Sequence, residues 1–261
     1  MNAVDTHGDE FVGTIIPLFA TNILPFGKFY LPSGVELICF TRTRHRFDSL
    51  PQDYLFVDDI WPGSRVLADF LVSTAHSIVG KYCLELGAGG ALPSLVAASL
   101  GATRTVISDF PADGVIENIL DVIAANHLDG AIAVGHIWGK ENSPPLLDLG
   151  YVNARGECEG YDIIFLAELL WKDTYQYHSK LLESISACLN KKGVAYMTFA
   201  HRPTPNSLDH TPDNDLEFFT LASLNFGLDS TLIQIYTEYH DVGENIPIAV
   251  YLYSLKFRTT V

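Results

Sequence analysis

The chain lacks any apolar run near the roughly 20 residues that a membrane-spanning helix requires. The longest candidates, such as YDIIFLAELLW at 161–171, have the length of a buried strand and its turn. The acidic start, MNAVDTHGDE, also lacks the basic and then apolar pattern of a targeting peptide. We therefore expect no membrane partner and a cytoplasmic location.

Cysteine is scarce, and the spacing of the cysteines does not indicate a metal site. The four cysteines are scattered without a CxxC pair: Cys39, Cys83, Cys158 and Cys188. This usage is typical of reduced thiols in a cytosolic protein. The nine histidines form no HExxH spacing, so we expect no metal site.

Basic residues are also few, with 16 against 31 acidic residues and a formal net charge of −15. Proteins that bind nucleic acid need a basic face to replace the counterions of the phosphates. The charge therefore argues against a nucleic-acid partner. It either serves solubility or attracts a basic protein substrate.

Segments typical of strands and helices alternate from residue 81 onward. The predicted strands are 82–86, 103–110, 131–137, 161–167 and 194–200, and the helices between them are 93–100, 112–126 and 174–190. Such alternation predicts an α/β fold with a mostly parallel sheet and helices on both faces. A Pro- and Gly-rich loop is predicted at 139–160.

The two ends of the chain depart from this alternation. Near the C-terminus, a helix at 213–224 precedes strands at 230–240 and 246–257, and the loop between these strands is too short for a parallel return. The sheet should therefore end in an antiparallel hairpin. Near the N-terminus we expect strands at 34–41 and 54–57 and a helix at 64–73 with Ser64 as its N-cap.

The glycine turn in LELGAGGALPSL, residues 84–95, has three interpretations. A phosphate-binding P-loop needs a Lys-Ser/Thr pair after the glycines, but Leu92, Pro93 and Ser94 follow here. A dinucleotide fingerprint needs glycine at its first, third and sixth positions. Gly87 and Gly89 satisfy the first two, whereas Leu92 occupies the last, so this interpretation stays open but fits less well.

S-adenosylmethionine, the third candidate, has no phosphates and needs small residues that let its amino-acid end approach the backbone. It also needs a carboxylate at the end of the next strand, to accept bonds from both ribose hydroxyls. Asp109 stands at that position, twenty residues after Gly89. The alternative is that Asp109 is an ordinary turn residue.

Taken in order, these features resemble the seven-β-strand S-adenosylmethionine-dependent methyltransferases. The features are the glycine turn, Asp109, the Trp138-Gly139 pair and the antiparallel ending. A leading Trp61 and an acidic Glu168 after the fourth strand are similar to the protein-lysine methyltransferase branch.

The resemblance covers roughly residues 55–257. It implies a Rossmann-like sheet of seven strands in one methyltransferase domain, 61–261, with residues 1–60 packed on the core as an extension. It also implies a monomeric cytoplasmic enzyme that methylates an N-terminal α-amine, a lysine or both. The implied substrate is a basic protein, translation elongation factor 1-alpha.

The same resemblance assigns roles to individual residues. Gly87, Ala88 and Gly89 would bind the amino-acid end of the cofactor and Asp109 its ribose. Trp138 would stack on the adenine. Trp61 would help to close the cofactor site, and the backbone of Ala167 would line the cofactor pocket. For the two tryptophans the alternative is core packing, because Trp is largely buried on average.

The sequence departs from the branch after the fourth strand. Where the branch commonly has Asp-x-x-Tyr, this chain has Glu168 and Trp171. We expect Glu168 to anchor the acceptor amine and Trp171 to wall its approach. The alternative is that Glu168 caps a helix beginning near Asp173, with Trp171 packed under it. Two other functions are compatible with the same cofactor-binding residues. One is a small-molecule N-methyltransferase acting on a nicotinamide-like amine, and the other is a catalytically silent binding protein.

Overall fold

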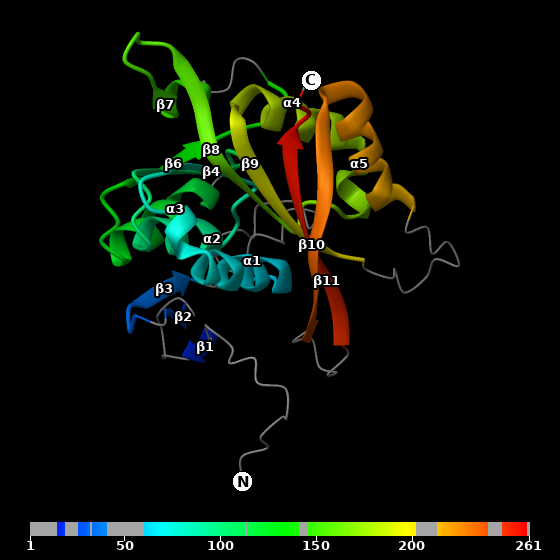
Figure 1. The fold of residues 1–261 in the computed structure, drawn as a ribbon. Coiled ribbons are helices and arrows are strands. Elements are labelled where there is room, and N and C mark those ends of the chain that lie inside the picture. The colour runs from blue at the N-terminus through cyan, green and yellow to red at the C-terminus, as the bar shows by residue number, and fades with distance from the viewer. Residues whose placement is uncertain are drawn as a thin grey trace.

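The computed structural model describes residues 15–18, 26–31, 33–40, 60–112, 114–140, 146–201, 213–239 and 247–259. The strand predicted at 54–57 lies outside these residues. Among the described residues, the main sheet follows the order β10-β11-β9-β8-β4-β5-β6, and a short β7 pairs with β8 (Figure 1). The strands are β4 (Tyr82–Leu86), β5 (Arg104–Asp109), β6 (Ala131–Gly135), β7 (Tyr151–Val152), β8 (Cys158–Ala167), β9 (Leu189–Ala200), β10 (Leu228–Tyr239) and β11 (Pro247–Phe257).

The direction of the strands confirms the predicted α/β fold. β9, β8, β4, β5 and β6 pair with one another in parallel, while β11 runs antiparallel to both β9 and β10, and the short β7 runs antiparallel to β8. The seven strands of the main path therefore form a mostly parallel sheet that ends in an antiparallel hairpin.

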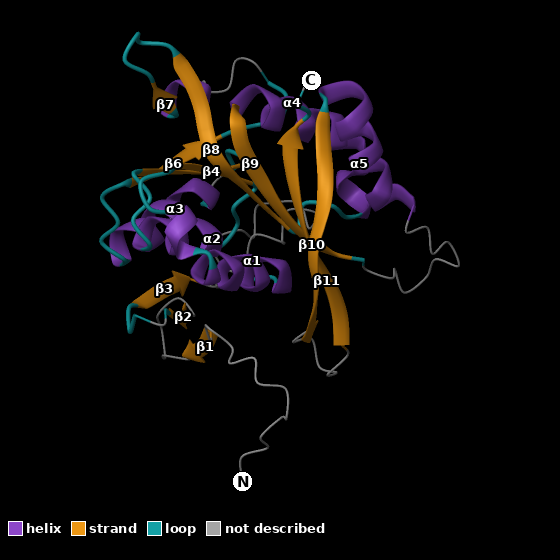
Figure 2. Cartoon of the chain, in the orientation of Figure 1, coloured by secondary structure: helices purple, strands orange, loops and turns teal. Residues whose placement is uncertain are grey.

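Helices cover both faces of the sheet (Figure 2). α1 (Pro62–Ser73), α2 (Leu92–Ser99) and α3 (Val115–Ala125) pack on one face, and α4 (His178–Cys188) and α5 (Asp213–Phe226) pack on the other. The described residues also form three short 3-10 helices, which are η3 (Ala75–Ser77), η4 (Leu146–Leu149) and η5 (Lys172–Tyr177).

The sequence of the central strand β8 is apolar without alternation because both of its faces are covered by helices. Ile163 and Phe165 belong to the core cluster beneath α1 and α2, whereas Ile164 and Leu166 belong to the cluster beneath α4 and α5. Successive side chains of a strand point to opposite faces, so a strand covered on both faces buries the side chains of both sets. The end of β8 is consequently held in place from both sides.

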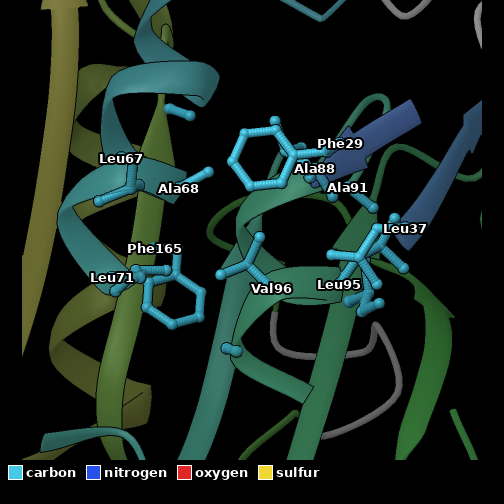
Figure 3. Packing of buried hydrophobic residues seen from close by; sticks show 14 of the residues in the cluster. Phe29, Leu37, Leu67, Ala68, Leu71, Ala88, Ala91, Leu95, Val96 and Phe165 are labelled. Atoms are coloured by element: carbon cyan, nitrogen blue, oxygen red, sulfur yellow. The ribbon is translucent and has the colours of Figure 1, made fainter. Parts of the chain in front are cut away.

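An antiparallel sheet of β1 (Ile15–Leu18), β2 (Phe26–Tyr30) and β3 (Glu36–Phe40) lies beside α2 and α3. The Asn126 side chain bonds to both the N–H and the C=O of Ile38, each at 2.7 Å. Phe29 of this sheet packs near Ala88 and Ala91, so it supports the glycine turn from outside (Figure 3). The division of the chain at residue 60 stays a prediction.

Three predictions of local structure were wrong. α1 begins at Pro62 with Trp61 as its N-cap, two residues before the start expected from Ser64, because proline at the first helical position loses no hydrogen bond. The helix predicted at 174–190 is split into η5 and α4 and ends at Cys188, where β9 begins. The predicted loop at 139–160 contains η4, β7 and the first residues of β8.

No described helix is long and apolar enough to cross a membrane. In the same part of the chain, no group of three or more His, Cys, Asp or Glu side chains could hold a metal ion. All four cysteines are free, with Cys158 exposed and the others buried.

Candidate active site

The glycine turn follows β4, between the neighbours β5 and β8, where the strand order reverses direction. Open α/β sheets bind their ligands at this position, outside the carboxyl ends of the strands. Gly87 and Gly89 both have left-handed backbones, with φ values of 65° and 52°. A Cβ on Gly87 would lie 2.7 Å from a Leu169 methyl carbon and 3.3 Å from the Trp138 ring, so the turn fits only glycine there.

Asp109 ends β5 and is hydrogen-bonded to the glycine turn. Its Oδ2 accepts from the Gly89 N–H at 2.7 Å, and its Oδ1 accepts from the Phe110 N–H at 2.6 Å. Burial raises the pKa of Asp109, although both N–H bonds act in the opposite direction. The structure thus brings together two residues that the sequence analysis had paired through spacing alone, while the ribose role of Asp109 stays a prediction.

Glu85 is a buried acid beneath this turn that the sequence analysis missed. It is 1% exposed, and its Oε2 accepts from the Ser94 N–H in the first turn of α2 at 3.1 Å. Among the described residues its Oε1 has no hydrogen-bond partner. Burial raises the pKa of Glu85 to about 8. A lone acidic residue inside the apolar run that precedes the glycines was the available signal.

Trp138 lies on the other side of the glycine turn and is partly buried. The segment that carries it is anchored twice, because the His136 N–H donates to the Asp109 carbonyl at 2.7 Å and the Gly139 N–H donates to Ser184 Oγ at 2.9 Å. The ring therefore stands beside Gly87 on a fixed backbone. This position suits the predicted contact with an adenine, and packing against the core occurs as well.

Glu168 joins three elements at the end of β8. It is 9% exposed, and its backbone is left-handed with φ 57°. Its Oε1 accepts from the Gly63 N–H at 2.9 Å, and its Oε2 accepts from the Ala200 N–H at 3.3 Å. Thr198 Oγ1 donates to the Gly63 carbonyl at 2.8 Å. The helix whose first turn Glu168 contacts is α1, which lies 105 residues earlier.

The remaining predicted site residues lie around Glu168. Trp61 precedes α1 and is partly buried, and Ala167, the last residue of β8, is 8% exposed. Trp171 is partly buried at the start of η5, where its N–H donates to Thr174 Oγ1 at 3.1 Å. Their proposed contacts with ligands stay predictions.

A second polar pair missed by the sequence analysis lies at the end of β9. His201 Nδ1 is 2.6 Å from Asp215 Oδ2, and Asp215 is 5% exposed. Asp215 comes from α5, across a long connection, so no local sequence pattern connects the two residues. The carboxyl edge of the sheet therefore carries two sets of functional groups. The glycine turn and Asp109 lie over β4 and β5. The carboxylates of Glu168 and Asp215 and the imidazole of His201 lie over β8 and β9.

Comparison with known proteins identifies the family of the chain. A model of the lysine methyltransferase family matches residues 56–225. A protein N-terminal and lysine N-methyltransferase of Neurospora crassa is 32% identical over 190 residues, and the match covers 69% of this chain and 64% of that protein. The corresponding enzyme of Gibberella zeae is 33% identical over 175 residues, and the match covers 62% of this chain and 63% of that protein.

The chain thus spans less than two thirds of the length of these relatives. Among solved structures, a Streptococcus mutans protein described as an S-adenosylmethionine-dependent methyltransferase matches with a TM-score of 0.54 and 18% identity. The match covers 91% of this chain and 57% of that protein, and at this identity it shows a shared fold alone.

Proposed function

Because the chain belongs to the lysine methyltransferase family, we propose that it transfers a methyl group from S-adenosylmethionine to an amine of a protein. The acceptor is an N-terminal α-amine, a lysine side chain or both, which are the acceptors named for the relatives. The observation that carries the proposal is the bond between Gly89 and Asp109, with the Trp138 ring beside Gly87.

The described residues fit this methyl donor. The left-handed turn from Gly87 to Gly89 offers bare backbone to the amino-acid end of the cofactor, with Ala88 between the two glycines. Asp109 accepts two N–H bonds, and a carboxylate has about four acceptor sites, so it retains sites for the ribose hydroxyls. Trp138 stacks on the adenine. The bound sulfonium supplies an electrophilic methyl group.

The acceptor amine enters at the ends of β8 and β9. Trp171 walls the approach of the amine and excludes water, while Trp61 helps to close the cofactor site and the backbone of Ala167 lines the cofactor pocket. Glu168 aligns the amine while it holds α1 against β9. In this arrangement the protein contributes mainly positioning and exclusion of water, since the methyl group is already activated.

The two kinds of acceptor differ in the cost of their deprotonation. With ordinary pKa values of about 10.4 for lysine and 7.7–8.0 for an α-amine, neutralising them at pH 7 costs about 4.6 and 1–1.4 kcal/mol respectively. Only the neutral amine has a lone pair for the methyl group. An α-amine is therefore the easier acceptor, and a lysine needs more help from the protein.

For the substrate we propose translation elongation factor 1-alpha in the cytoplasm, acted on by a monomer. The net charge of −15 supports a basic protein partner, because opposite charges speed encounter.

One experiment separates this proposal from its rivals. The purified chain is incubated with methyl-labelled S-adenosylmethionine and a lysate that lacks the native enzyme. Label should enter a protein of the mass of elongation factor 1-alpha, at its N-terminal amine or a lysine. Label found in small-molecule fractions would instead identify a small-molecule methyltransferase. Cofactor binding without any transfer would identify a silent binding protein.

A further inference from the structure

The His201–Asp215 pair begins one residue along the chain from a backbone N–H group that binds Glu168. The Ala200 N–H donates to Glu168 Oε2, and His201 is the next residue along the chain. His201 contacts the rings of Phe199 and Tyr251, with centroids 5.4 and 5.1 Å apart. These contacts place the imidazole on the face of the sheet that α5 covers, at its carboxyl edge.

Asp215 forms a hydrogen bond with one nitrogen of this imidazole. It is 5% exposed, and its Oδ2 lies 2.6 Å from His201 Nδ1. A carboxylate only accepts hydrogen bonds, so Nδ1 carries the proton and donates it to Asp215. In the neutral form of the ring Nε2 then has the lone pair, and no described residue bonds to it. The His201 side chain is 32% exposed, so it is reachable from solvent.

The other titratable groups around the pair are poor proton acceptors. Burial and the charge of Asp215 raise the pKa of Tyr175 to about 12, so its phenol keeps its proton. Burial lowers the pKa of His178, although Asp215 and Glu217 oppose the change, and this ring is 6% exposed. Glu168 uses both of its oxygens on backbone N–H groups.

We propose that His201 is the proton acceptor for the substrate amine, with Asp215 as its positioning residue. The inference rests on the proposed function. Nε2 takes a proton from the acceptor ammonium, which leaves a neutral amine and an imidazolium that Asp215 stabilises. The amine nitrogen then bonds to the methyl carbon as the carbon–sulfur bond breaks, and the electron pair of that bond goes to sulfur. The methylated ammonium and S-adenosylhomocysteine are the products.

The test compares wild type, His201→Gln, Asp215→Asn and the matched control His76→Gln, whose histidine is exposed on η3. The substrate is unmethylated elongation factor 1-alpha, and mass spectrometry reads its N-terminal amine and its lysines separately. Each kcat and KM is measured from about pH 6 to about pH 9. Calorimetry with S-adenosylhomocysteine and thermal unfolding verify that each variant is folded.

We expect His201→Gln to lower kcat for lysine about 10²-fold or more at pH 7, a usual contribution of general base catalysis. For the α-amine the loss should be about tenfold or less, because its deprotonation costs only 1–1.4 kcal/mol. The rate of the variant should rise about tenfold per pH unit over a range in which wild type has levelled off. Asp215→Asn should change the pH profile in the same direction with little effect on KM, whereas His76→Gln should match wild type.

An active wild type together with a His201→Gln variant of unchanged rate and pH profile would overturn this inference and leave the proposed function standing. A wild type that binds S-adenosylhomocysteine but methylates neither position would overturn the proposed function, and the inference with it. Should His201→Gln fail to fold, Asp215→Asn decides: a changed pH profile supports the inference and an unchanged one overturns it.

Discussion

Replacing Glu168 by glutamine removes one charge and one acceptor from the junction of α1, β8 and β9. In the wild type, its two oxygens accept from Gly63 and Ala200. Glutamine has a single acceptor oxygen, so its amide NH₂ must face one of these two N–H donors. One buried backbone N–H therefore loses its partner in either orientation of the amide.

The size of the effect follows from that count. A hydrogen bond to a charged group contributes about 1.5–3 kcal/mol, and each kcal/mol shifts Tm by about 2–4 °C in a chain of this size. Glu168→Gln should therefore lower Tm by about 3–12 °C. Turnover should fall about tenfold or more, while S-adenosylhomocysteine affinity changes little, because most of the proposed cofactor contacts, at the glycine turn and Asp109, lie over β4 and β5. Differential scanning fluorimetry, a methylation assay and calorimetry measure the three quantities.

Two further variants make this prediction specific. Glu183→Gln is the matched control, because Glu183 forms an exposed ion pair with Lys180, and such pairs contribute little. Gly63→Ala should be destabilising, since the new Cβ would lie 2.8 Å from Glu168 Cγ. With Glu168→Ala already present the same change should stabilise by up to about 1 kcal/mol, as alanine does in a helix. A Glu168→Gln protein with wild-type Tm and full turnover would refute the reasoning.

Three other perturbations test the rest of the site. Asp109→Ala should weaken S-adenosylhomocysteine binding about 10- to 100-fold by calorimetry, from a lost charged partner, whereas the exposed control Asp129→Ala should bind normally. Glu85 has a pKa of about 8 in the fold against 4.5 in the unfolded chain, so its contribution to stability falls as pH rises between these values. Glu85→Gln should therefore gain in stability over wild type from about pH 5 to about pH 8 in denaturant titrations, and parallel curves would contradict this assignment. Added salt should raise KM for the protein substrate more than it weakens cofactor binding, because it screens exposed charges, and equal sensitivity would leave solubility as the role of the −15 charge.

Local patterns of the sequence were sufficient for the class of fold. Alternating strands and helices predicted the parallel sheet, and the short connection before β11 predicted the antiparallel hairpin, because both depend on neighbouring residues. The arrangement of the proposed cofactor site could be predicted for the same reason. The glycine turn and Asp109 end two consecutive parallel strands, which places them at one edge of the sheet before any tertiary contact is known.

The part of the site proposed for the acceptor amine could be predicted only partly from the sequence. Glu168 was predicted as a site residue from its position after β8, but its hydrogen-bond partners were not predicted, because Gly63 lies 105 residues away in the sequence. Glu85 was overlooked although it stands in the glycine motif, because an acid in an apolar run does not reveal which helix it faces. The N-cap of α1 was placed at Ser64 because side-chain capping was expected where proline begins the helix.

The sequence by itself determined the order of the elements, the glycine turn and the carboxylate that bonds to it, since each is encoded within a few residues or by the step from one strand to the next. Only the tertiary structure decided which distant groups meet at the carboxyl edge of the sheet. Glu168 reaches α1, and Asp215 reaches His201, because packing of α1 and α5 on opposite faces of the sheet brings their first turns to that edge. Contacts of this kind depend on how whole helices and strands pack, so the local periodicity of the sequence does not predict them.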